Sequence, residues 1–420
     1  MRPQVAIVFS ITLIIFLLID FYVYKGLKHI GSGSDFLNWQ KWLPYAYWTL
    51  SVVTYVGVLF MILGSRSFSD PKNYVYFYGF FGFMILFFVP KLVFSVFHLA
   101  EDLIRAGNWM VYKISPTLNG LEGTGISRMK FISQTGLALA AIPFTGILYG
   151  MIQGRFNFKV LEHKLSFKKL PKAFDGLRIV QISDIHIGSF FSNHKPVEAA
   201  IASINQLKPD LIFFTGDLVN NYAKETDGWI DIFSKLEAKM GKYSILGNHD
   251  YGDYGQYDSE EEKTANFEGV KQANRDMGFR LMLNESLKIQ KDGEEFDLIG
   301  VENWGEGGFH KKGDLPKALQ GVNPESFKLL LSHDPSHWDS QVRDTDIDLT
   351  LSGHTHGMQF GVEIGNFKWS PVKYRYPRWA GLYRESEQYI HVNRGFGYIG
   401  FPGRVGIMPE ITLIELNSQA

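Results

Sequence analysis

The sequence contains no cysteine, which excludes disulfide bonds, thiolate metal ligands and a cysteine nucleophile. It also lacks a strong charge bias, because 42 Lys and Arg nearly balance 43 Asp and Glu and leave a formal net charge of -1. Such a balance provides no overall attraction to nucleic acid, so we expect no nucleic-acid partner. The chain has no internal repeat and no low-complexity linker, and its 420 residues suit two domains of ordinary size.

The first third of the chain carries four long apolar runs. They cover residues 5–24 (interrupted by Asp20), 45–64, 74–99 and 132–151. A helix rises about 1.5 Å per residue, so roughly 20 apolar residues cross a hydrocarbon layer of about 30 Å. One run alone could be a buried core helix, and a cleaved signal peptide could explain the first run only. Four runs so close together instead predict an all-α membrane region of about four transmembrane helices, over residues 1–153.

Charged and aromatic residues within this region indicate how it meets the membrane surface. Asp20 and Lys91 lie near ends or breaks of their runs, so we expect both side chains to reach the interface. At one edge of the second run, an aromatic belt is expected from Trp39, Trp42, Tyr45, Tyr47 and Trp48.

The distribution of basic residues bears on orientation. With four spans, slightly more Lys and Arg lie on the side that carries residues 154–420. This excess favours a multi-pass membrane protein with a cytoplasmic C-terminal domain. One segment points the other way, because Ser127 to Ile132 resembles a degraded twin-arginine export signal that lacks the second arginine.

From about residue 154 onward the apolar runs shorten to strand length. The pattern predicts strands at 177–182, 211–214 and 243–246, and helices at 195–207 and 229–240. Further strands are predicted at 287–289, 296–301, 327–331, 349–351, 389–392 and 411–416. Alternating strands and helices are typical of α/β domains with βαβ units, and residues 154–420 are predicted to form one.

Potential metal ligands follow five of the predicted strands. The five blocks are Ser183-Asp184-Ile185-His186, Gly216-Asp217-Leu218-Val219-Asn220, Gly247-Asn248-His249-Asp250, Leu331-Ser332-His333-Asp334 and Gly353-His354-Thr355-His356-Gly357. Open α/β sheets place ligands at the carboxyl ends of their strands, so the five blocks can converge. Any single block could be an ordinary turn or cap. Together, however, they indicate a metal site.

Asp, His and Asn side chains suit Mn, Fe or Zn better than soft metals. In a site with two metal ions, the ions lie about 3.5–4 Å apart and need a shared ligand. Asp217, a single carboxylate after a central strand, fits that bridging position.

This set of blocks, in this order, resembles the calcineurin-like metallophosphoesterase superfamily over residues 164–416. The resemblance implies a four-layer sandwich of two mixed sheets flanked by helices. It also implies two divalent metal ions, of which one is bound by Asp184, His186 and His356, the other by Asn248, His333 and His354, and both by Asp217. A hydroxide between the metals would attack phosphorus, while His249 would stabilise the transition state or protonate the leaving oxygen.

Within the superfamily, the C-terminal segments are similar to those of bacterial membrane-attached phosphodiesterases, which implies a place in the bacterial inner membrane. These segments are Asn393-Arg394-Gly395-Phe396-Gly397, Pro402-Gly403-Arg404 and Pro409-Glu410-Ile411. One position departs from the superfamily pattern. Many members have an aspartate three residues after the bridging one, where it can orient the catalytic histidine, and this chain has Asn220. An amide stabilises a histidinium less than a carboxylate does.

Three further features bear on the site. Residues 371–384 interleave basic and aromatic side chains, either as a surface for phosphate groups or as a structured loop. Residues 305–313 are expected to form a flexible loop near the site, and they lack the Lys-Ser/Thr of an ATP-binding P-loop. Tyr251 and Tyr254 follow the third block and could line its pocket.

Together these observations predict a membrane-bound, metal-dependent hydrolase of phosphate esters, with a diester favoured over a monoester. Membrane attachment suggests a lipid-linked substrate, such as a phospholipid or a nucleotide-linked lipid. The alternative is a membrane sensor or scaffold whose phosphatase-like domain binds a ligand without turnover. A complete set of ligands argues against that alternative, because a non-catalytic relative would be free to lose them.

Overall fold

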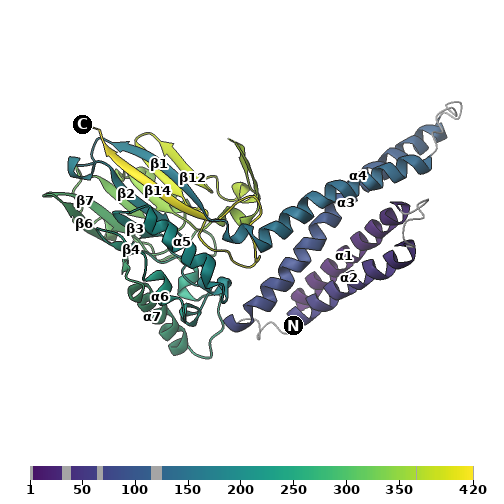
Figure 1. Ribbon diagram of the computed structural model, residues 1–420, viewed down its shortest axis with the longest axis horizontal. Helices are drawn as coiled ribbons and strands as arrows, with labels where there is room; N and C mark the ends of the chain where they lie inside the picture. Colours follow the sequence, from purple (N-terminus) through teal and green to yellow (C-terminus); the bar gives the residue numbers. More distant parts are fainter. Residues whose placement is uncertain (1–2, 31–38, 64–69, 115–124, 366, 420) are drawn as a thin grey trace. The chain divides into compact units, whose positions relative to one another are not determined.

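The computed structural model describes residues 3–30, 39–63, 70–114, 125–365 and 367–419 (Figure 1). The chain divides into two compact units. The membrane unit contains Met1–Ser65 and Gly79–Tyr149, and the catalytic unit contains Arg66–Tyr78 and Gly150–Ala420, as far as these ranges are described. The short connection before α3 therefore groups with the C-terminal unit.

The membrane unit is built from four long helices, α1 (Pro3–Ile30), α2 (Trp39–Leu63), α3 (Tyr74–Ile114) and α4 (Gly125–Ile152). Within the described residues, three segments are long and apolar enough to span a bilayer: Lys41–Leu63, Pro71–Val111 and Phe131–Ile152. The first predicted apolar run lies within α1. Each helix contributes one residue to a small common core of Val23, Tyr47, Phe94 and Ala140.

The prediction that Asp20 and Lys91 reach the membrane surface is wrong. Their side chains are 4% and 12% exposed, and Lys91 Nζ lies 2.6 Å from Asp20 Oδ1. Tyr47 and Tyr55 donate their hydroxyl hydrogens to the same carboxylate, and Lys91 also donates to Ser51 Oγ. Asp20 lies on α1 and Lys91 on α3, and the two side chains neutralise each other inside the bundle. Because the partners belong to different helices, no local sequence pattern reveals their contact.

The catalytic unit contains two mixed six-stranded sheets and a separate two-stranded hairpin. The first sheet has the order β1 (Lys159–Phe167), β14 (Glu410–Ser418), β2 (Leu177–Ile182), β3 (Leu211–Phe214), β4 (Lys242–Ser244) and β5 (Arg280–Leu281). The second has the order β12 (Gly381–Glu385), β13 (Gln388–Val392), β9 (Leu349–Ser352), β8 (Lys328–Leu331), β7 (Glu294–Gly300) and β6 (Glu285–Lys291). The hairpin pairs β10 (Val362–Ile364) with β11 (Phe367–Trp369).

The two sheets face each other across an apolar core. Successive side chains of β2 point to opposite faces of the first sheet. Ile179 packs into the core between the two sheets, and Val180 packs into the core between the first sheet and its helices. On the outer face of the first sheet lie α5 (His194–Gln206), α6 (Ile230–Phe233) and α7 (Glu260–Asp276) (Figure 1). The outer face of the second sheet carries α8 (Leu315–Ala318) and α9 (Ser336–Ser340). The predicted α/β four-layer sandwich is therefore confirmed.

One predicted helix is wrong in extent. Residues 229–240 were expected to be helical, but α6 covers only Ile230–Phe233. The backbone N–H groups beyond it bond to another segment: those of Glu237 and Met240 donate to Asn205 and Asp210. The sequence analysis also missed β1, β12 and α7. The last of these is strongly polar, and only Val270, Ala273 and Asn274 are buried along it.

The ends of two membrane helices belong to the catalytic unit. At the start of α3, Tyr74 donates to Glu225 Oε1 at 3.4 Å, and just before it Asp70 lies 3.3 Å from Lys224 Nζ. At the end of α4, the Gly150 carbonyl accepts the Arg404 N–H at 3.1 Å. A Cβ on Gly150 would lie only 2.6 Å from the Arg404 carbonyl oxygen, so this approach requires glycine.

Candidate metal centre

The five blocks converge where the carboxyl ends of both sheets meet. Parallel strands β2, β3 and β4 carry the first three blocks, and parallel strands β8 and β9 carry the other two. The backbone holds this arrangement at a conformational cost. Five of the seven predicted ligands have φ between 45° and 73°, namely Asp184, His186, Asp217, His354 and His356. Non-glycine residues in this region cost about 1–3 kcal/mol each and cluster at functional sites.

Six of the seven predicted ligands form two groups that share one carboxylate. The first group contains Asp184, His186, Asp217 and His356, and the second contains Asp217, His333 and His354. Within each group the candidate ligand atoms all lie within 4.8 Å of one another. The seventh, Asn248, joins the second group, because its Oδ1 lies 2.9 Å from His354 Nδ1.

The imidazoles are oriented so that nitrogen atoms converge on the carboxylates. The Nδ1 atom of His333 lies 2.7 Å from the Thr215 carbonyl oxygen, and that of His186 lies 3.2 Å from the Val219 carbonyl oxygen. A carbonyl only accepts, so both Nδ1 atoms carry hydrogen and leave Nε2 to face the site. The two Nε2 atoms then lie 3.2 and 3.6 Å from Asp217 Oδ2.

This donor set fits divalent metal ions. The Nε2 atoms of His186 and His356 face each other at 3.0 Å, an arrangement that a shared cation satisfies for both lone pairs. Although burial opposes protonation, the Asp217 carboxylate raises the pKa of His333 to about 10. The carboxylates thus favour a positive charge at this site, and a bound cation would provide that charge in place of the proton on His333.

Asp250 connects two of the ligand-bearing loops. Its carboxylate accepts the backbone N–H groups of Asp217 and Gly247 at 2.9 Å and of Leu218 at 2.8 Å. Burial and the neighbouring Asp217 charge raise the pKa of Asp250 to about 7. Asp250 therefore determines how the second and third blocks lie against each other.

His249 lies against the shared carboxylate. Its backbone N–H donates to Asp217 Oδ1 at 2.8 Å, and its ring packs edge-on against His186 with centroids 4.9 Å apart. The ring Nδ1 lies 2.7 Å from the backbone carbonyl oxygen of Asn220. The side chain of Asn220 points elsewhere, with Oδ1 accepting from Ser189 Oγ at 3.2 Å. A backbone carbonyl thus orients His249, and the amide at position 220 does not weaken that contact.

Comparison with known proteins identifies the family. Residues 2–155 match the family "Probable Calcineurin-like phosphoesterase, transmembrane domain", and residues 177–358 match "Calcineurin-like phosphoesterase". The uncharacterized metallophosphoesterase YkuE of Bacillus subtilis is 32% identical over 303 residues, which cover 70% of this chain and 98% of YkuE. The chain belongs to the calcineurin-like metallophosphoesterases. As a member it is a hydrolase of phosphate esters that uses divalent metal ions, and it carries a transmembrane domain.

Two further metallophosphoesterases are similar to this chain. A transmembrane protein with metallophosphoesterase domain from Danio rerio is 31% identical over 293 residues. The match covers 68% of this chain but only 63% of that protein, which is less than two thirds of its length. Phosphodiesterase YaeI of Escherichia coli is 29% identical over 300 residues, which cover 69% of this chain and 99% of YaeI.

Several residues of this metallophosphoesterase contact the site without having been predicted to do so. Tyr376 places its hydroxyl 2.9 Å from His354 Nε2, on the side of the ring opposite Asn248. Asp334 Oδ2 lies 3.8 Å from the same nitrogen. Arg404 is fully buried and donates to the carbonyl oxygens of Gly397 at 2.8 Å and of His356 at 3.3 Å. The sequence signal for Tyr376 was its place in the basic and aromatic segment 371–384.

The two interpretations of residues 371–384 apply to different residues of the segment. Tyr376 and Trp379 are buried, and Arg378 pairs with Asp339 and Glu385, as expected of a structured loop. In contrast, Lys373, Tyr374 and Arg375 are exposed.

The loop 305–313 lies near the site, as predicted. The Phe309 ring packs edge-on against His354, with centroids 4.9 Å apart. His310 stacks on Tyr251 at 4.0 Å, and its Nδ1 lies 2.7 Å from Asp253 Oδ2. Tyr254 also contacts the site, because its hydroxyl accepts from Asn248 Nδ2 at 3.0 Å and its ring lies 4.6 Å from that of His249.

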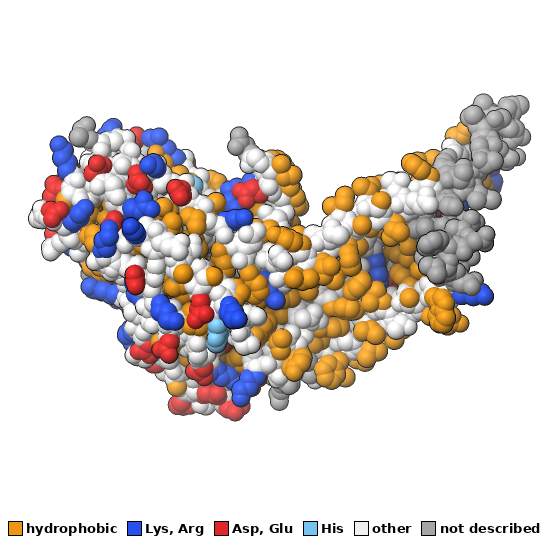
Figure 2. Space-filling model, in the orientation of Figure 1, with side chains coloured by type: hydrophobic (Ala, Val, Ile, Leu, Met, Phe, Trp, Pro, Cys, Tyr) orange, Lys and Arg blue, Asp and Glu red, His pale blue; other side chains and the backbone are white. Residues whose placement is uncertain are grey.

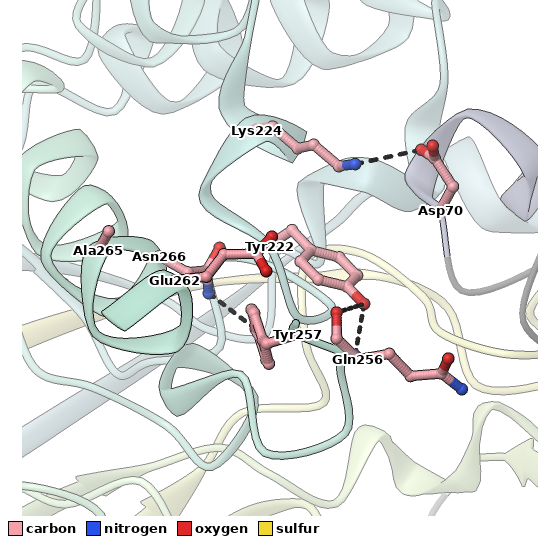
Figure 3. Close-up of a pocket in the computed structure, with 8 residues that line it drawn as sticks. All are labelled: Asp70, Tyr222, Lys224, Gln256, Tyr257, Glu262, Ala265 and Asn266. Carbon is pink, nitrogen blue, oxygen red and sulfur yellow. Dashed lines mark hydrogen bonds and ion pairs between the residues drawn. The ribbon is translucent and has the colours of Figure 1, made fainter. Parts of the chain in front are cut away.

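A cavity of about 400 Å³ is lined in part by the segment that follows Asn220 and by α7 (Figure 3). Its described lining contains none of the predicted ligands and consists of Asp70, Tyr222, Lys224, Gln256, Tyr257, Glu262, Ala265 and Asn266. Tyr257 and Asn266 both donate to the Asn221 carbonyl oxygen, at 3.2 and 2.9 Å. The cavity wall therefore supports the backbone next to Asn220 and is separate from the metal centre.

Proposed function

We propose that this metallophosphoesterase is a phosphodiesterase with two metal ions, acting on a lipid-linked phosphate diester at the membrane. The observation that carries the proposal is the sharing of Asp217 between two ligand groups, in which every residue except the half-buried His354 is buried. The name of the relative YaeI, a phosphodiesterase, supports a diester. The transmembrane domain supports a substrate held at the membrane.

The residues would act in distinct roles. Asp184, His186 and His356 would hold one ion, Asn248, His333 and His354 the other, and Asp217 would contact both. When bound, the ions would generate a nucleophile from water and neutralise charge on the phosphate. Their class would be Mn, Fe or Zn, given imidazole, amide and carboxylate ligands.

His249 is suited to the proton transfer. Its Nδ1 is committed to the Asn220 carbonyl, so Nε2 is the nitrogen available to a leaving-group oxygen. Burial lowers the pKa of His249, while the Asp217 charge opposes that shift. A P–O bond forms to the water oxygen and the ester P–O bond breaks. His249, protonated on Nε2, would give that proton to the departing alkoxide, and the proton that the attacking water loses would restore it.

The test compares ester classes with the full chain in lipid nanodiscs. Bis-p-nitrophenyl phosphate, p-nitrophenyl phosphate and a fluorescent phospholipid are each supplied after metal removal and after adding back Mn, Fe or Zn. We expect metal-dependent hydrolysis of the diester and the phospholipid, with the monoester slower. Faster monoester hydrolysis would contradict the diester assignment, and no turnover with any metal would favour the ligand-binding alternative.

We also infer that the catalytic unit faces the cytoplasm of a bacterial cell, on the basis of the small excess of Lys and Arg on its side. Because the chain has no cysteine, Glu387→Cys would introduce one exposed thiol, at a side chain that is 79% exposed. A membrane-impermeant maleimide should label that thiol only after the cells are opened. Labelling of intact cells would place the unit outside the cytoplasm.

A further inference from the structure

The hairpin of β10 and β11 presents an apolar face away from the catalytic unit. Cross-strand pairing aligns Val362 with Trp369 and Ile364 with Phe367, so all four side chains lie on one face. Val362, Ile364 and Phe367 are 40%, 73% and 61% exposed. Figure 2 shows hydrophobic side chains along one side of this projecting hairpin and charged side chains on the other.

The opposite, polar face anchors the hairpin to the catalytic unit. Glu363 binds both guanidinium nitrogens of Arg394, at 2.7 and 2.8 Å, and Lys368 donates to the Ala380 carbonyl oxygen. In a hairpin surrounded by water the apolar face would turn toward the core. In this hairpin the polar face is turned toward the core and the apolar face outward. A two-stranded hairpin also gains little stability from its own strand pairing in water. We therefore expect the apolar face to be covered by an apolar environment.

Chain connectivity brings the hairpin close to the membrane. The α4 segment that can span a bilayer ends at Ile152. Gly150, in its last turn, accepts the N–H of Arg404, and the next residue, Val405, exchanges hydrogen bonds with Gln359 and Gly361 at 2.7 and 2.9 Å. Val362 follows directly. Three backbone hydrogen bonds, all within the catalytic unit, thus connect the end of a membrane span to the base of the hairpin.

The surroundings of the hairpin match a lipid surface. Met358 and Tyr374, in neighbouring segments, are 55% and 78% exposed, and beside Tyr374 the basic residues Lys373 and Arg375 are exposed as well. Apolar side chains flanked by basic ones are typical of elements that insert about 5–10 Å into a bilayer interface. Each strand has three residues, which at about 3.3 Å per residue gives a reach of the same size.

We propose that the β10–β11 hairpin inserts its apolar face into the lipid interface on the membrane side of the catalytic unit. The hairpin begins six residues after His356, so insertion brings the bilayer surface next to the metal centre. The proposal depends on the membrane attachment of the chain and not on the reaction it catalyses.

The test uses the absence of cysteine from the chain. Single variants Ile364→Cys and Phe367→Cys are labelled with a fluorophore in the full chain, reconstituted in phosphatidylcholine vesicles that contain an anionic phospholipid. Lys288→Cys is the matched control, because its side chain is 46% exposed on β6, the edge strand at the far side of the second sheet. Thermal unfolding verifies that each variant is folded.

We expect lipids with a nitroxide on the acyl chain to quench the two hairpin labels strongly and the Lys288→Cys label hardly at all. Quenching of the hairpin labels by aqueous iodide to the same extent as the control would overturn the proposal, because the face would then be in water. Protection from iodide without quenching by nitroxide would overturn it too, since protein, such as a second copy of this chain, would cover the face.

Discussion

The membrane unit and the catalytic unit both bury ionised side chains, but they balance the charge differently. In the membrane unit, Asp20 is paired with Lys91 and receives two tyrosine hydroxyls. In the catalytic unit, imidazoles face the carboxylates: His356 lies beside Asp184, and His186 and His333 lie beside Asp217. The first arrangement is complete within the chain. The second attracts positive charge that metal ions can supply, so burial of charge has a structural role in one unit and a chemical role in the other.

The largest effect is expected from Asp217→Asn. Removing the one carboxylate that both ligand groups share should abolish metal binding and hydrolysis together, at a cost of at least about 4 kcal/mol in transition-state stabilisation, or roughly a thousandfold in rate. Metal content by mass spectrometry and diester hydrolysis measure the two losses. Asp231→Asn, on the exposed side of α6, should change neither. Retained activity in Asp217→Asn would contradict the bridging role.

His249→Ala should lower turnover by about 10²–10⁴-fold, the usual contribution of a positioned acid or base. The metal content should remain that of the unchanged protein, because His249 lies outside both ligand groups. Metal analysis of the same preparation used for kinetics makes the distinction. Loss of metal in this variant would mean that His249 is a ligand rather than an acid.

Lys91→Met tests the buried ion pair of the membrane unit. It should destabilise the membrane unit by about 3–5 kcal/mol, because Asp20 would remain buried without its partner. Unfolding of the detergent-solubilised chain measures the loss, while metal content should not change. The double variant Asp20→Asn with Lys91→Met should recover most of the stability. If Lys91→Met alone is tolerated, the pair is not a structural element of the bundle.

The smallest effect is expected from Tyr376→Phe. The hydroxyl lies 2.9 Å from His354 Nε2 and holds the ring in its orientation, so its loss should weaken metal affinity by about 10–100-fold. Competition with a chelator measures affinity independently of activity. Tyr374→Phe is the matched control, since Tyr374 is exposed two residues away. Equal affinity in the two variants would show that the contact does not position the ligand.

Much of the fold could be predicted because its signals are local. Strands β2, β3 and β9 are short apolar runs, and each ligand block follows its strand directly. Helix α7 was missed because its polar sequence has only a narrow buried stripe. The extent of α6 was wrong because hydrogen bonds to residues 205–210 replaced the helical ones. Competition from distant backbone cannot be seen in a periodic pattern.

The sequence by itself determined that apolar segments of spanning length precede an α/β domain, and that five blocks of Asp, Asn and His follow buried strands. These properties depend on the order and spacing of neighbouring residues. Only the tertiary structure decided which charges neutralise each other, as with Asp20 and Lys91, and that the Asn220 backbone rather than its side chain orients His249. It alone also showed that the β10–β11 hairpin turns its polar face inward. Such contacts join residues far apart in the chain, and their energies arise only when folding brings the partners within bonding distance.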